Sequence, residues 1–112
     1  MYVGYYINDP CQCGRTRHQI LRAYGPFSDK NTAWGAIMEE VSSINAQDRS
    51  WAHDEIVCYD VVEYTTIPVD SNALYLQARY DDYGKWEVDE NQLYSTDELN
   101  DGYDQVARLY LV

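Results

Sequence analysis

One segment of the chain carries hydrophobic residues at the spacing of a helix. They recur every three or four positions, which predicts a helix over about residues 29–44 with one apolar face. Ser28 stands where the N-cap is expected, and Asp29 falls in the first turn, where the helix dipole favours a carboxylate. The opposite face is polar, so we expect the helix to pack on one face of a sheet. The apolar stripe consists of Trp34, Ile37, Met38, Val41 and Ile44.

The other hydrophobic segments are short, rich in β-branched and aromatic residues, and separated by turn signals, which is typical of strands. We expect the second strand to end at Gly25-Pro26 and to form a hairpin with the first, and residues 81–84 to form the turn of a later hairpin. Residues 95–98 have the pattern of a helix capping box and are expected to form a short helical turn. The predicted strands are residues 2–7, about 17–24, 55–66, 73–80, 85–89 and 105–112.

This order of elements predicts an α+β fold. Sequential hairpins, one helix and no alternation of strand with helix favour an antiparallel sheet of about five or six strands, with the helix of residues 29–44 packed on one face. At 112 residues, of which 46% are hydrophobic, the chain is expected to form a single domain, residues 1–112, that needs neither disulfides nor a metal to fold.

The net charge of −11 is concentrated in the C-terminal half. Residues 57–112 contain twelve Asp and Glu against three Lys and Arg, whereas residues 1–56 contain seven against five. Between residues 79 and 104 the acids are interleaved with aromatic residues, and carboxylates attract basic surfaces while tyrosines supply rigid contact area. The sequence therefore predicts a partner-binding surface, the acidic-aromatic patch, made of Tyr80, Asp81, Asp82, Tyr83, Trp86, Glu87, Asp89, Glu90, Tyr94, Asp97, Glu98, Asp101, Tyr103 and Asp104.

The carboxylates of this patch have a spacing that relates them to DNA. On a strand, Glu87 and Asp89 would point to one side about 6.6 Å apart, and one DNA strand presents a phosphate about every 3.4 Å of its axis. A row of carboxylates therefore roughly imitates a row of phosphates. The alternative is that these acids only solvate one side of the sheet. In either case the charge argues against direct binding to nucleic acid or to an anionic membrane.

The basic residues form one island, which includes Arg15, Arg17, His18 and Arg22. Pairing of this island with the acidic half, within one chain or between two, is the expected role, and a homodimer is therefore possible.

Cys11, Cys13 and His18 are candidate metal ligands, with His53 and Cys58 as further ones. A C-x-C pair differs from the C-x2-C knuckles of common zinc sites, so we expect reduced thiols and no metal, and keep a metal- or thiol-dependent protein as an alternative.

The sequence contains none of the local motifs of nucleotide-binding loops, serine hydrolases or zinc proteases. We therefore expect no catalytic residues, no cofactor and no enzymatic activity. The opening MYVGYYINDP has no pattern of a secretion signal, which predicts a cytoplasmic protein of the host cell.

Tyr2-Val3-Gly4-x-Tyr6, followed by Cys13-Gly14 and by an acid-bearing helix before Asp54-Glu55, resembles the opening of plasmid and phage antirestriction proteins. This resemblance implies an acidic DNA mimic that occupies the DNA-binding groove of a defence enzyme. By composition alone, the chain also resembles phage-encoded inhibitors of the anti-CRISPR type.

The leading hypothesis is a non-enzymatic inhibitor that binds the basic surface of a nucleic-acid-binding protein, such as a nuclease, a restriction enzyme or a CRISPR effector. The second hypothesis is a self-associating structural or adaptor domain of a phage or mobile element, in which the tyrosines make subunit contacts.

Overall fold

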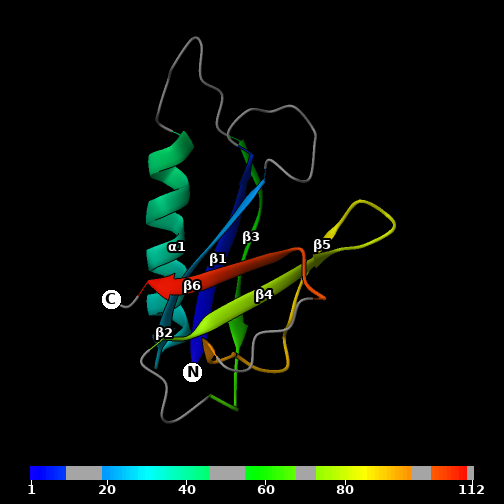
Figure 1. The fold of residues 1–112 in the computed structure, drawn as a ribbon. Coiled ribbons are helices and arrows are strands. Elements are labelled where there is room, and N and C mark those ends of the chain that lie inside the picture. Colours follow the sequence, from blue (N-terminus) through cyan, green and yellow to red (C-terminus); the bar gives the residue numbers. More distant parts are fainter. Residues whose placement is uncertain (10–18, 46–54, 68–72, 97–101, 111–112) are drawn as a thin grey trace.

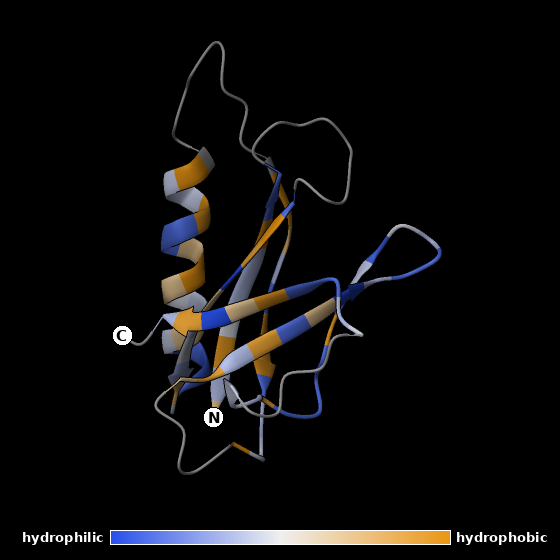
Figure 2. Ribbon diagram, in the orientation of Figure 1, coloured by the Kyte–Doolittle hydropathy of each residue, from blue (hydrophilic) through white to orange (hydrophobic). Residues whose placement is uncertain are grey.

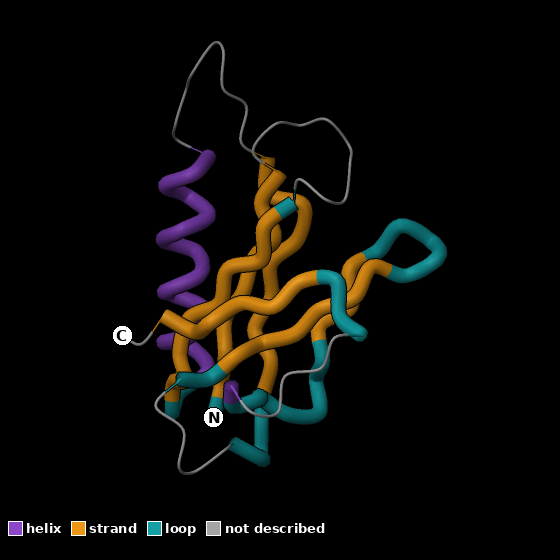
Figure 3. Tube along the Cα trace, in the orientation of Figure 1, coloured by secondary structure: helices purple, strands orange, loops and turns teal. Residues whose placement is uncertain are grey.

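The computed structural model describes residues 1–9, 19–45, 55–67, 73–96 and 102–110 (Figures 1 and 3). These ranges contain one helix and a six-stranded sheet, which confirms the α+β class. All six expected strands and the helix lie within a few residues of the predicted positions, and the turn expected at 95–98 falls partly outside the described residues. The elements are β1 (Tyr2–Asp9), β2 (Ile20–Phe27), α1 (Lys30–Asn45), β3 (Glu55–Glu63), β4 (Tyr75–Tyr80), β5 (Trp86–Val88) and β6 (Gln105–Tyr110).

The sheet is mixed, so the prediction of an antiparallel sheet was wrong at one pair of strands. The strand order is β3-β1-β2-β6-β4-β5, and every pair is antiparallel except β2 with β6. The parallel pair joins Ala23 to Leu109 and Tyr24 to Tyr110. Hairpins are encoded by local turn residues, whereas this pairing brings together segments far apart in the sequence, and no local pattern announces it.

The sheet curls until it is nearly barrel-shaped. In Figure 1, β4 and β6 run across the front of β1 and β3 rather than beside them. The alternate residues of the strands that face the inside of this curl form the main core, because side chains alternate between the two faces of a strand. The main core consists of Val3, Tyr5, Ile7, Leu21, Ala23, Tyr64, Leu74, Leu76, Ala78, Leu93, Ala107 and Leu109.

Helix α1 packs outside the curl, mainly against β1, β2 and β3. The expectation that it covers one face of the whole sheet therefore needs correction, because the β4-β5-β6 half curls away from it. A second, smaller core lies here and consists of Tyr6, Ile37 and Val41. Met38, placed on the apolar stripe from the sequence, is 41% exposed, because the buried stripe is centred on Ala33, Ile37 and Val41.

Strand β2 continues through Gly25-Pro26, where the sequence predicted its end. Tyr2 pairs with Phe27 and Gly4 pairs with Tyr24, so the register shifts between these positions. The shift is a β-bulge, a position that tolerates proline because the extra residue is not part of the regular ladder. Gly25 has a φ of 132°, which residues with a side chain rarely adopt.

The sequence suggested Ser28 as the helix cap, but the structure shows that Asp29 caps the helix. The Asp29 carboxylate accepts hydrogen bonds from the amide and the hydroxyl of Thr32, both at 3.0 Å, and Asp29 carbonyl oxygen accepts from the Ala33 amide at 3.2 Å. An amide three residues beyond the cap is one of the donors that a helix start leaves unpaired. Both Ser28 and Asp29 are residue types that cap well, and only the backbone geometry decides between them.

We expect Asp29→Ala to lower the free energy of unfolding by about 1 kcal/mol, since it removes the acceptor of the Thr32 amide. Ser28→Ala, one position earlier, should change it by less than about 0.5 kcal/mol. Urea denaturation of both variants measures the difference. Equal effects at the two positions would contradict the assignment of the cap.

Candidate functional site

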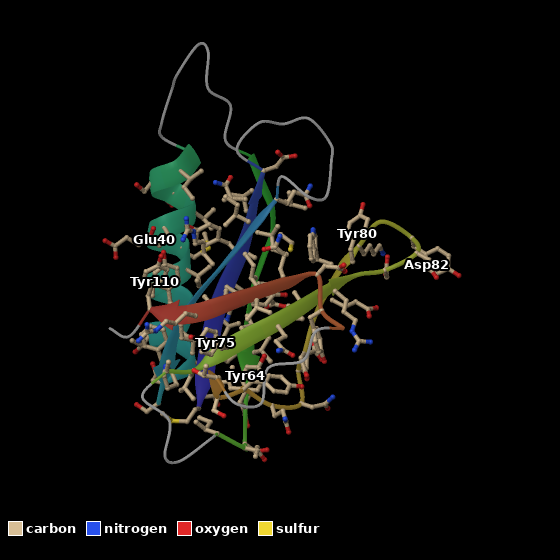
Figure 4. All side chains as sticks on the ribbon, in the orientation of Figure 1. Glu40, Tyr64, Tyr75, Tyr80, Asp82 and Tyr110 are labelled. Carbon is tan, nitrogen blue, oxygen red and sulfur yellow. The ribbon has the colours of Figure 1, made fainter. Side chains whose placement is uncertain are left out.

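The acidic-aromatic patch lies on the β4–β5 hairpin and on the segments that lead to and from it. The hairpin projects away from α1 and from the rest of the sheet, and Figure 4 shows Tyr80 and Asp82 on this projection. Its turn is drawn blue to white, which marks hydrophilic and neutral residues, whereas β1 and β3 mix hydrophobic with hydrophilic residues (Figure 2). Eleven of the fourteen predicted residues lie in the described part of the chain, and Asp97, Glu98 and Asp101 lie outside it.

The turn of the hairpin, residues 81–85, is built around the side chain of Asp81. Its Oδ1 atom accepts the amides of Tyr83 at 2.9 Å and Lys85 at 2.7 Å, and the Asp81 amide donates to the carbonyl oxygen of Lys85 at 2.8 Å. An aspartate that binds its own turn in this way fixes the backbone locally. Asp82 and Tyr83 are therefore held outward, and Tyr83 is 91% exposed. We call residues 81–85 the hairpin tip.

Asp89 organises the segment after β5. Its carboxylate accepts hydrogen bonds from the hydroxyls of Tyr94 and Tyr103, the latter at 2.8 Å, and from the Asn91 amide at 2.9 Å. Its carbonyl oxygen accepts the hydroxyl of Tyr64, which is 1% exposed. Three tyrosines thus donate to one residue. Asp89 lies beyond the end of β5 at Val88, so it does not form the regular row with Glu87 that a longer strand would give.

The environment keeps this carboxylate ionised. Burial alone would raise the pKa of Asp89, but the hydrogen bonds from Tyr94, Asn91, Tyr103 and Gln92 outweigh burial and hold the pKa below its usual value of 3.8. Burial also raises the pKa of Tyr94, and its hydrogen bond to Asp89 raises it further. The Tyr94 hydroxyl therefore remains a donor and the Asp89 carboxylate remains an acceptor.

The carboxylates that remain accessible surround the hairpin. Asp82, Glu87, Glu90 and Asp104 are all exposed, although one oxygen of Asp104 accepts the Tyr80 amide at 2.8 Å. In the described part of the chain these four form no ion pair with a lysine or arginine. Their side chains therefore face solvent.

The aromatic residues of the patch divide into fixed and accessible ones. The Trp86 ring packs edge-on against Tyr80 with the centroids 5.3 Å apart, and its Nε1 donates to Gln19 Oε1 at 2.6 Å. The Tyr103 ring carries the guanidinium of Arg79, whose central carbon lies 4.4 Å from the ring centroid. Trp86, Tyr94 and Tyr103 are half-buried, so Tyr83 and Tyr80 present the largest accessible rings.

A hollow of about 450 Å³ opens beside the hairpin. Carboxylates and aromatic rings make up most of its wall, and Arg79 is its only cation among the described residues. Sequence reasoning missed Arg79, which lies opposite Glu87 in the β4–β5 hairpin. No local signal marks Tyr5, which comes from β1. The lining consists of Tyr5, Arg79, Trp86, Glu87, Val88, Asp89, Glu90, Asn91 and Tyr103.

The candidate metal ligands Cys11, Cys13, His18 and His53 lie outside the described residues. Cys58 is a half-buried free thiol, and burial and the nearby Asp60 raise its pKa, so it stays protonated and is a poor nucleophile. The described residues contain no cluster of three or more histidine, cysteine, aspartate or glutamate side chains placed to hold a metal ion.

The helix in the described part of the chain is too short and too polar to cross a membrane. Comparisons with protein-family models, with curated proteins and with solved structures find no match for the chain.

Proposed function

We propose that this protein is a non-enzymatic inhibitor that binds the basic, nucleic-acid-binding surface of a nuclease, restriction enzyme or CRISPR effector. The observation that carries the proposal is the projecting hairpin. Its exposed carboxylates form no ion pair with the lysines and arginines that the structure describes, and it carries the 91% exposed ring of Tyr83. A carboxylate in an ion pair has its charge largely cancelled by its partner. The exposed carboxylates of Asp82, Glu87, Glu90 and Asp104 instead extend a negative field into solvent.

The two kinds of side chain have different parts in the proposed complex. The carboxylates of Asp82, Glu87 and Glu90 steer the encounter, which raises association rates by about 10- to 1,000-fold and weakens as salt screens it. The ring of Tyr83 enters the contact as an anchor, because exposed aromatic residues that become buried supply much of the affinity of an interface. Asp89 acts indirectly by holding Tyr94 and Tyr103 in place.

The hollow beside the hairpin accepts a basic side chain of the target in this proposal. Its wall offers Glu87 and Glu90 together with the ring of Trp86, and carboxylates with aromatic faces are what a guanidinium or ammonium group binds. Arg79 already covers Tyr103 and is outnumbered by the carboxylates. The resemblance to antirestriction proteins leads to the same class of target.

The proposal is tested by capturing partners of the tagged protein from a nucleic-acid-rich bacterial lysate at low and high salt. The patch variant combines Asp82→Lys with Glu87→Lys. The matched control combines Glu39→Lys with Glu63→Lys, which reverses two exposed carboxylates on α1 and β3 and gives the same net charge.

The expected result is a basic nucleic-acid-binding protein that the wild type and the control retain at low salt, that the patch variant loses, and that added DNA displaces. Equal loss by the patch variant and the control would assign the binding to overall charge, and equal retention would contradict a role of the hairpin. A captured partner that high salt and DNA leave in place would contradict the DNA-mimic mechanism.

A further inference from the structure

The parallel strands β2 and β6 are paired over a short stretch only. Their register covers Ala23 with Leu109 and Tyr24 with Tyr110, in the middle of β2 and at the C-terminal end of β6. On the N-terminal side of this pairing the two segments are joined by one hydrogen bond, in which Gln105 Nε2 donates to the carbonyl oxygen of Gln19 at 2.9 Å. A groove of about 580 Å³ lies along this incompletely paired stretch, and we call it the β2–β6 slot.

The slot differs in chemistry from the rest of this acidic chain. Its lining in the described part of the chain consists of residues 20–22 and 105–110, and none of these is an aspartate or glutamate. Ile20, Val106 and Tyr110 are 39%, 42% and 49% exposed, so its surface is largely apolar. Arg22 and Arg108 are exposed and supply two positive charges, and the Arg22 guanidinium donates to the Tyr110 hydroxyl at 2.9 Å. Such a surface suits an aromatic ring flanked by carboxylates.

The hairpin tip of the same protein has these properties. It exposes the Tyr83 ring almost fully, with the exposed carboxylate of Asp82 beside it. The Asp81 hydrogen bonds to the Tyr83 and Lys85 amides already fix the turn, so little conformational entropy is lost when the tip docks. The tip has two aspartates against Lys85 and so carries a net negative charge, opposite to that of Arg22 and Arg108, and its exposed ring suits the apolar part of the slot.

We propose that the hairpin tip of one copy docks in the β2–β6 slot of a second copy. The Tyr83 ring lies against Ile20 and Val106 of the slot, and the Asp82 carboxylate pairs with Arg108. Tip and slot are different surfaces, so the contact is head-to-tail, and an open assembly keeps one free tip at one end and one free slot at the other. This inference does not rest on the inhibitor function.

The net charge of −11 sets the conditions under which the contact forms. Whole copies repel each other at long range, while the tip and the slot attract at short range. At an ionic strength of 0.15 M the Debye length is about 8 Å, so the long-range repulsion is screened more than a pair in contact. Self-association should therefore increase from low to physiological salt, opposite to the salt response proposed for target binding.

The experiment measures the weight-average mass of the full chain by sedimentation equilibrium at 0.15 M salt. The protein concentration runs from about 10 μM to about 1 mM, which covers the dissociation constants expected for interfaces of small area. The tip variant is Tyr83→Ser, and the slot variant is Val106→Glu. The matched control is Val57→Glu on β3, because Val57 is 43% exposed, as Val106 is 42%, and lies outside the slot.

We expect the mass of the wild type and of Val57→Glu to rise with concentration past that of a dimer, and each of the other variants to associate about tenfold more weakly or not at all. A 1:1 mixture of the tip and slot variants should form dimers and stop there, because the mixture offers one intact tip for one intact slot. A wild type that stays monomeric over the range would overturn the proposal, as would a mixture that stays monomeric.

The two proposals fail separately. Val106 lies outside the acidic-aromatic patch, so Val106→Glu should lose self-association and keep the salt-sensitive capture of a target. Loss of capture by Val106→Glu would show that the slot, and not the patch alone, takes part in target binding.

Discussion

Replacing Gly4 by alanine should lower the free energy of unfolding by about 1–3 kcal/mol, the usual cost of forcing extra volume into a packed interior. Gly4 lies on β1 under the helix. An added Cβ would stand 2.1 Å from Cγ1 and 2.8 Å from Cδ1 of Ile37, and 3.3 Å from the carbonyl oxygen of Ala33. No side chain fits at 2.1 Å, so Ile37 or the whole helix must move. The helix therefore approaches the sheet at the one position of β1 that has no side chain.

The same substitution at Gly35 is the control. Nothing lies within 4 Å of a Cβ added there, and Gly35 is an exposed position in the middle of α1. Gly35→Ala should stabilise the protein by about 0.5–1 kcal/mol, since glycine is disfavoured inside helices. Thermal and urea denaturation measure both, and in an Ile37→Ala background Gly4→Ala should cost less than it does alone. Opposite signs at the two glycines are expected, and equal shifts would contradict the close approach of α1.

Replacing Asp89 by alanine should lower the free energy of unfolding by about 2–3 kcal/mol. The substitution removes the acceptor shared by the Tyr94 and Tyr103 hydroxyls and the Asn91 amide. Hydrogen bonds to a charged group contribute about 1.5–3 kcal/mol each, and the three are not additive because they share one carboxylate and lie in a half-buried position. Glu90→Ala, at the exposed neighbour, should change the stability by less than about 0.5 kcal/mol.

This contribution of Asp89 should depend on pH. Its folded pKa lies below 3.8, so the unfolded chain takes up the proton at a higher pH than the folded one. The stabilisation is complete above the unfolded pKa and is lost as the pH falls through the folded pKa. The difference between the wild type and Asp89→Ala, measured by urea denaturation, should therefore be constant near pH 7 and shrink below about pH 4. A difference that stays constant down to pH 2 would show that the carboxylate is not the ionised acceptor.

The local part of the fold is predictable from the sequence, and the long-range part is not. The helical spacing around Ile37 and the turn at residues 81–84 lie in contiguous segments, and both elements form where they were expected. The parallel pairing of β6 with β2 depends on how the whole sheet curls, and no residue of either strand specifies it. Gly25-Pro26 has the pattern of a stop but forms a bulge, because the strand can continue when the extra residue leaves the ladder.

In the candidate site, too, the local features were predictable from the sequence and the long-range contacts were not. The sequence predicted the acidic-aromatic character of the hairpin, and the exposure of Asp82 and Tyr83 agrees with it. It did not separate these residues from Asp89, which has the same chemistry but is held by two tyrosines. A tyrosine in a core and a tyrosine on a surface have the same pattern in sequence. Only the curl of the sheet, which buries Tyr64 near Asp89, distinguishes them.

The measurement that tests the central claim most directly is the displacement of a fluorescent DNA duplex from the captured enzyme, followed by polarisation as this protein is added. The account predicts full displacement by the wild type and by the Glu39→Lys, Glu63→Lys control, and at least about tenfold weaker displacement by the Asp82→Lys, Glu87→Lys variant. DNA that stays bound while the protein also binds would contradict the claim that the acidic-aromatic patch occupies a nucleic-acid-binding surface.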